Sequence, residues 1–431
     1  MKRLIILVFV LCFANGFGQE SKKIFTSDID NFWLAYDNIQ QAKTYNEKLN
    51  LINEFYIKKA SKGLVAFMKA RDYNDSLYVK LIDDYPKFWN SIRPNTLAIK
   101  DKTDQLSNAV SNLKKLYPEL KDAEMYFTIG GLRSGGTVTD NMVLVGAEIA
   151  TGTPNVDVSE FPNTWLKKVF ERQTLDNIVY LNIHEYIHTQ QVGGKSRLLN
   201  QSIKEGSCDF IAELALGKPI QTQYLDYGRS HLPEIKEAFK KEMFSNNLSN
   251  WLYNGQQKEN ADLGYFVGYQ ICKDYYDGLT DKAKAIKDII RLNYSDNHAV
   301  EDFLYKSKFF NEKINKGKII EDYKKQQPYV VGFEPFKNNS KIVDSTTKEL
   351  RITFSKPMNP HAFSINYTKK GPDYYPITKV KGFENDDKTM VLVLDLKANK
   401  DYEFVITNNS FRSKDGYPLA KEEYLVKFKT N

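Results

Sequence analysis

The sequence predicts an α+β protein in which a mainly helical region with a small β-sheet is followed by an all-β sandwich. Two patterns in the sequence predict this fold class. From about residue 25 to residue 323, apolar residues recur mostly at spacings of three and four, which is the repeat of an amphipathic helix. After residue 328, short segments alternate apolar and polar residues, as half-buried strands do. A domain boundary near residue 328 is therefore expected.

Residues 1–19 have the layout of a secretory signal peptide, with two basic residues before an apolar run that ends near Ala14. This run is shorter than the roughly 20 residues that a membrane-spanning helix needs. We expect an exported protein without a transmembrane segment, located in the periplasm, on the cell surface or outside the cell. A lipid anchor on Cys12 is the weaker alternative, because Val10 and Leu11 stand where such a signal has small residues.

Composition and cysteine content restrict the class further. The chain is 42% hydrophobic and 27% charged, as in ordinary globular proteins, and its 431 residues suggest two or three domains. The lysines behind the net charge of +7 are scattered, so no nucleic-acid partner is expected. Beyond the leader only Cys208 and Cys272 remain, which excludes a disulfide framework and leaves either one bridge or two free thiols.

The region from residue 20 to 327 divides near residue 122. Before it, aromatic-rich stretches such as "DNFWLAYDNI" and "YVKLIDDYPKFWNSIRP" have helical spacing and predict core-facing helices. After it, "AEMYFTIGG" and "NMVLVGAEI" predict a pair of strands joined by a glycine-rich connection. Helical spacing then returns, with a helix stop at Gly217, and Gly264 and Gly268 would let their helix pack closely against another.

The segment "LNIHEYIHTQQ" contains the candidate chemistry. His184 and His188 are four apart and share one face of a helix, while Glu185 stands beside them. Two imidazoles and a third ligand could hold zinc, and the neighbouring carboxylate could accept a proton from zinc-bound water. The plain alternative is a helix on which unrelated histidines happen to fall.

A second pair of residues supports the metal interpretation. Glu205 and Asp209 are four apart on the next predicted helix, "IKEGSCDFIAELA", whose apolar residues indicate substantial burial. Glu205 could be the third zinc ligand, and Asp209 could accept the N–H of a zinc-bound histidine.

With these residues the region resembles the gluzincin metallopeptidases, the thermolysin-like clan, and is similar to predicted secreted bacterial zinc-dependent proteases. The resemblance implies a zincin-type domain over residues 20–327, whose zinc-site part is residues 123–327. It implies a zinc ion held by His184, His188 and Glu205, Glu185 as general base, and Asp209 as the residue that orients a ligand.

Other residues could serve such a site. The strand Met142–Ile149 lies where such enzymes align an extended peptide, although a plain core strand fits its sequence equally well. Tyr265, Tyr269 and His231 are possible transition-state stabilisers, with a core or surface role the ordinary expectation for each.

Residues 328–431 resemble a bacterial Ig-like domain, on the segments "FSKPM" and "DGYPL" and the alternating runs around them. Such a domain implies contact with cell-surface or extracellular partners. The leading hypothesis is thus an exported zinc metallopeptidase that hydrolyses a peptide or protein substrate. The alternative is a catalytically inactive binding or structural protein of the cell envelope that uses the Ig-like domain.

Overall fold

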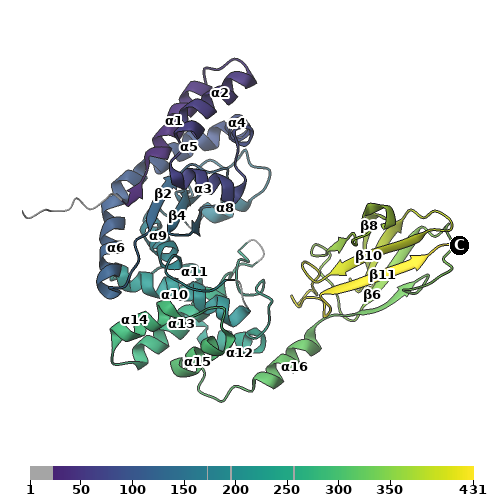
Figure 1. Ribbon diagram of the computed structural model, residues 1–431. Coiled ribbons are helices and arrows are strands. Elements are labelled where there is room, and N and C mark those ends of the chain that lie inside the picture. Colours follow the sequence, from purple (N-terminus) through teal and green to yellow (C-terminus); the bar gives the residue numbers. More distant parts are fainter. Residues whose placement is uncertain (1–22, 172, 195–196, 256–257) are drawn as a thin grey trace, which may run out of the picture. The chain divides into compact units, whose positions relative to one another are not determined.

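The computed structural model describes residues 23–171, 173–194, 197–255 and 258–431 (Figure 1). The leader predicted at residues 1–19 lies outside these ranges. The described chain forms two compact units. The first contains residues 23–108 and 121–189, and the second contains residues 109–120 and 190–431.

Helices surround an aromatic core in the first unit, as the aromatic stripes predict. Phe32, Tyr56, Phe88 and Trp89 are fully buried, and their rings contact neighbouring aromatic rings. The helices of this unit are α1 (Ser27–Ile39), α2 (Tyr45–Phe55), α3 (Lys62–Arg71), α4 (Asp75–Asp84), α5 (Pro86–Leu97), α7 (Ala147–Ala150), α8 (Trp165–Phe170) and α9 (Asn177–His188). The 3₁₀ turns Ile57–Lys59 and Ala98–Lys102 follow α2 and α5, and α6 (Thr103–Leu116) runs from the first unit into the second.

One four-stranded sheet completes the first unit. Its strands are β1 (Ile24–Phe25), β2 (Glu124–Thr128), β3 (Gly136–Thr139) and β4 (Met142–Gly146), in the order β1-β2-β4-β3. β1, β2 and β4 are parallel, whereas β3 runs antiparallel to β4.

The sheet corrects two sequence-based expectations. The glycine-rich connection between the predicted strands contains a strand of its own, β3. The predicted strand Met142–Ile149 ends at Gly146, because Ala147–Ala150 turns into the short helix α7. Since β4 lies between β2 and β3, both of its edges are already paired, and it cannot accept a peptide as an added strand.

The second unit begins with helices that pack around two crossing helices, α10 (Leu198–Leu216) and α13 (Leu263–Gly278). A Cβ on Gly268 would lie 1.7 Å from the carbonyl oxygen of Ser202, which confirms the close approach predicted from the two glycines of α13. Gly217 ends α10 in the left-handed conformation, as expected for a helix stop. The other helices are α11 (Gln223–Ser230), α12 (Leu232–Glu242), α14 (Lys282–Arg291), α15 (Asn297–Ser307) and α16 (Lys316–Gln326).

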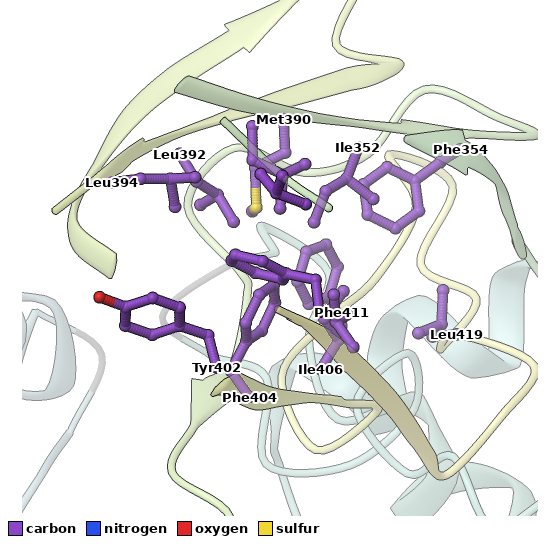
Figure 2. Close-up of a cluster of buried hydrophobic side chains, with 14 of the residues drawn as sticks. Ile352, Phe354, Met390, Leu392, Leu394, Tyr402, Phe404, Ile406, Phe411 and Leu419 are labelled. Atoms are coloured by element: carbon purple, nitrogen blue, oxygen red, sulfur yellow. The ribbon is translucent and has the colours of Figure 1, made fainter. Parts of the chain in front are cut away.

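The C-terminal part is the predicted β-sandwich. One sheet has the order β5-β6-β9-β8, and the other has the order β11-β10-β7. Figure 2 shows side chains of both sheets meeting in the core, among them Ile352, Leu392, Phe404 and Ile406, all fully buried. The strands are β5 (Val330–Glu334), β6 (Glu349–Phe354), β7 (Ile365–Asn366), β8 (Ile377–Glu384), β9 (Thr389–Leu394), β10 (Asp401–Thr407) and β11 (Glu423–Lys429), with a 3₁₀ turn at Pro372–Tyr374.

Two further sequence questions have structural answers. Cys208 and Cys272 are both buried, and no disulfide bond joins them, so of the two possibilities left open by the sequence the bridge is not formed. Among the residues that the structure describes, no helix has the length and apolar character needed to cross a membrane.

Candidate functional site

Helix α9 brings two of the predicted metal ligands together. Ile183 and Ile187 are fully buried and anchor the helix, so that His184 and His188 share the neighbouring face one turn apart. Their Nε2 atoms are 3.1 Å apart, and His184 is only 7% exposed. This spacing is that of an N–H···N hydrogen bond between the two rings. It is also close to the roughly 3.3 Å between two nitrogens bound tetrahedrally to one zinc at about 2.0–2.1 Å.

The position of α9 in the first unit is fixed by Tyr186. Its buried hydroxyl accepts a hydrogen bond from the backbone N–H of Ala123 at 2.9 Å, just before β2. Burial also raises the pKa of the Tyr186 hydroxyl. On another face of α9, Glu185 lies beside β3, where a Cβ on Gly136 would be 4.0 Å from its Cγ.

Glu205 is held by two donors within the second unit. The carboxylate atom Oε1 accepts hydrogen bonds from Gln201 Nε2 at 2.9 Å and from the Tyr253 hydroxyl at 2.8 Å. Tyr253 has φ +58°, a left-handed conformation that is uncommon for a residue with a side chain. Sequence reasoning missed Tyr253, because it lies in an irregular segment between α12 and α13 where no periodicity marks a contact.

Asp209 is fully buried one turn after Glu205. Its Oδ2 accepts a hydrogen bond from the Tyr224 hydroxyl at 2.8 Å. The predicted cost of burying this carboxylate is thus offset by at least one hydrogen bond. A contact that orients a zinc-bound histidine stays a prediction.

The three candidate stabilisers have different surroundings. Tyr265 is packed against the rings of Tyr224 and Tyr253, and burial raises the pKa of its hydroxyl. By contrast, the Tyr269 hydroxyl donates to Glu213 at 2.7 Å. His231 stacks on the ring of Tyr227, with centroids 4.0 Å apart, and its Nδ1 lies 2.9 Å from the carbonyl oxygen of Tyr227. These contacts give Tyr269 and His231 local structural roles.

The predicted site draws on both units of the chain. His184, Glu185 and His188 belong to the first unit, and Glu205 and Asp209 belong to the second. Each half has the local geometry described above. The assembly of the three ligands around one ion remains a prediction.

Comparison with protein families gives the class of the chain first. Residues 324–430 match the bacterial Ig-like domain, which confirms the C-terminal assignment made from the sequence. The N-terminal part then gives the family itself. Residues 19–263, more than half of the chain, match the gliding motility protein GldB, and the chain belongs to this family.

This family overturns the resemblance to gluzincin metallopeptidases and the enzyme expected from it. The matched family is one of gliding motility proteins and not of peptidases, so the expectations of a hydrolase, of a peptide substrate and of Glu185 as general base lose their support. The reason lies in the motif. H-E-x-x-H is short, and any helix with two histidines four apart presents the same face whether or not catalysis follows.

The remaining comparisons add no argument. No curated protein matches the chain. Among solved structures, the S-layer protein SbsC is 13% identical, with 94% of this chain and 44% of that chain covered and a TM-score of 0.17. A second structure, of domains 1–6 of SbsC, is also 13% identical, covers 76% of this chain and 45% of that chain, and has a TM-score of 0.18. The chain spans less than half the length of either.

Proposed function

We propose that this chain is a non-catalytic structural or binding component of the cell envelope that takes part in gliding motility, with its Ig-like domain as the contact to partners. The observation that carries this proposal is the family match over residues 19–263. The signal-peptide layout of residues 1–19 and the Ig-like domain over residues 324–430 both suit a protein that works at the cell envelope.

The structure of the sandwich supports a binding role for residues 328–431. Its interior is closed by large apolar side chains, while the outward positions of β6 and β8 carry charged residues such as Arg351, Lys379 and Lys381. A stable scaffold with a polar, charged surface can bind a partner without any reactive group. More specifically, we propose that the Ig-like domain contacts a cell-surface or extracellular partner.

Genetic complementation in a gliding bacterium that carries this gene tests the proposal. We expect the deletion strain to lose movement, the full-length gene to restore it, and a gene lacking residues 328–431 to fail although its product is exported. Glu185→Gln should restore movement fully, because the proposed function needs no proton acceptor. Loss of movement with Glu185→Gln at normal protein level, or full movement without residues 328–431, would contradict the proposal.

We also propose that the chain binds a structural zinc ion through His184 and His188 of α9. The spacing of 3.1 Å between the two Nε2 atoms favours it, and imidazole is a preferred ligand of zinc. A bound ion would stabilise the native state, since metal binding adds to folding free energy.

The zinc proposal is tested by metal analysis and thermal unfolding of the purified mature chain. We expect about one zinc per chain and a lower midpoint of unfolding after chelation. His184→Ala should lose the metal, whereas His231→Ala, whose ring stacks on Tyr227, should keep it. Wild-type protein without zinc after incubation with the ion would overturn this proposal and leave the envelope role untouched.

A further inference from the structure

A cleft of about 690 Å³ lies within the second unit, between the end of α12, the helix α16 and the segment that follows β10. This volume is in the range of small-molecule sites, roughly 300–1,000 Å³. Hydrogen bonds join its two walls. Asn247 Nδ2 donates to the carbonyl oxygen of Gly416 at 3.1 Å, and Gln327 Nε2 donates to that of Pro418 at 3.3 Å. These bonds hold the helical wall and the sandwich wall together.

Arg412 lines this cleft with a half-buried guanidinium. Its Nη1 donates a hydrogen bond to Oδ1 of Asn247 at 2.6 Å, and the same oxygen accepts one from Ser249 Oγ at 2.9 Å. Asn247 is only 5% exposed, so Arg412 is anchored to a buried side chain. Burial lowers the pKa of the Arg412 guanidinium. A positive charge removed from water in this way is costly unless an anion pairs with it.

The cleft has an excess of positive charge. Lys241 and Lys324 line it together with Arg412. Within the described ranges none of these three cations forms an ion pair, whereas the lysines adjacent to Lys241 and Lys324 do. The two carboxylates at the cleft, Glu422 and Glu423, are exposed to water. An anionic group of a ligand would therefore meet cations whose charge no carboxylate of the protein already pairs.

The rest of the lining is mostly uncharged and suits a sugar. Asn246, Asn408 and Asn409 offer side-chain amides, which donate and accept hydrogen bonds as each hydroxyl of a sugar does. Phe244 and Ile320 are half-buried and supply apolar surface for the C–H groups of a sugar ring. This amide-rich lining differs from the sheet edge or apolar groove that usually takes a peptide.

We propose that this cleft binds a carboxylated sugar, a uronic acid unit of an acidic glycan, with the carboxylate at Arg412 and the hydroxyl groups at the asparagine amides. A guanidinium can hold a carboxylate through two parallel hydrogen bonds, which compensate the water that Arg412 loses on burial. The assignment rests on the proposed role of the Ig-like domain as the contact to envelope partners, and it names the chemistry of one such partner.

Isothermal titration calorimetry on the full-length mature chain tests the site, with the trimers of galacturonic acid and of mannuronic acid as probes. We expect at least one of them to bind at a single site per chain. The uncharged trimer of galactose should bind at least about tenfold more weakly, which is the scale of losing a hydrogen bond to a charged group.

Two variants locate the binding in the cleft. Arg412→Gln removes the proposed partner of the carboxylate and should weaken binding by about tenfold or more. Because Arg412 also contacts Asn247, the second variant leaves that contact in place. Lys324→Glu puts a repelling charge into the cleft from an exposed position on α16, and it should weaken binding about fivefold or more.

Lys325→Glu is the matched control. It makes the same change of charge one residue further along α16, but Lys325 pairs with Glu321 and does not line the cleft. Its affinity for the probe should stay within about twofold of wild type, because exposed ion pairs contribute little.

Three results would overturn the assignment. The first is a wild-type chain that binds neither uronate trimer at about 10 mM, beyond even weak millimolar affinity. The second is an equal loss of affinity with Lys324→Glu and Lys325→Glu, which would reduce the effect to overall charge. The third is equally tight binding of triglutamate, which would make this an acidic-peptide site. Should Arg412→Gln fail to fold, the two lysine variants still decide. None of these results changes the complementation test of gliding, which measures movement of cells.

Discussion

Gly268 shows how a single residue sets the spacing of the central helices. At this position α13 crosses α10, and an added Cβ would meet backbone atoms of Ser202 at 1.7 and 2.4 Å. Backbone atoms cannot rotate away as a side chain can, so the two helices would have to separate. The same α10 carries Glu205 and Asp209, which makes this crossing the scaffold of the second half of the candidate site.

We predict that Gly268→Ala lowers stability by about 2 kcal/mol or more, the scale of overpacking in a close-packed interior. Gly278→Ala is the matched control, because Gly278 ends the same helix with no atom within 4 Å of an added Cβ. It should change stability by less than about 1 kcal/mol, and alanine could even be favourable there. Urea unfolding followed by far-UV circular dichroism measures both, and equal effects would refute the crossing as described.

At the scale of elements, helices α11, α14, α15 and α16 of the second unit begin at side-chain caps. Asp281 caps α14 through the N–H of Lys284, and Thr222 caps α11 through the N–H of Leu225. Asp296 caps α15, with Oδ1 accepting from the N–H groups of His298 and Ala299 at 2.9 and 3.2 Å. Each cap satisfies donors that the first helical turn cannot satisfy itself.

We predict that Asp296→Ala destabilises the second unit by about 1 kcal/mol, the usual cost of losing an N-cap. Asp296→Asn keeps an oxygen in the same place and should lose only a few tenths of that, since asparagine caps helices about as well as aspartate. Thermal unfolding of the two variants beside wild type provides the measurement. An Asn variant as unstable as the Ala variant would show that the negative charge, and not the cap, is what matters.

Elements also show what the sequence could and could not predict. The helices, β2 and β4 follow from periodicity and from runs of apolar residues, which are local signals. β3 was missed because "GTVT" is short, lies among glycines and becomes a strand only by pairing with β4. The contact between Tyr253 and Glu205 was missed because it joins residues 48 apart in the chain.

The candidate site was predicted only in part for a related reason. Helical spacing correctly placed His184 and His188 side by side, since four residues make about one turn. The same spacing cannot distinguish an enzyme from another protein that uses the same helix, and the family match corrected the enzyme expectation. Chemistry depends on what surrounds a motif, and five letters do not specify the surroundings.

At the scale of the whole molecule, the sandwich has a core of its own. Leu392 on β9 and Phe404 on β10 come from different sheets, and both are 0% exposed in the same apolar cluster (Figure 2). Alternation along the strands of both sheets supplies enough apolar residues for a separate core. Because the sandwich has this core of its own, we still predict that residues 328–431 fold independently of residues 20–327.

We predict that residues 328–431, produced alone, unfold in a single cooperative transition, and that residues 20–327 keep their helical signal without them. Phe404→Ala in the full chain should lower the stability of the sandwich by about 3–5 kcal/mol, since it removes a buried ring and leaves a cavity. The helical part should then unfold at its wild-type midpoint, because no core residue is shared between independent domains. Calorimetry resolves the two transitions. A Phe404→Ala variant in which both transitions shift together would mean that the sandwich and the helices form one cooperative unit, and that the boundary near residue 328 separates patterns of sequence without separating domains.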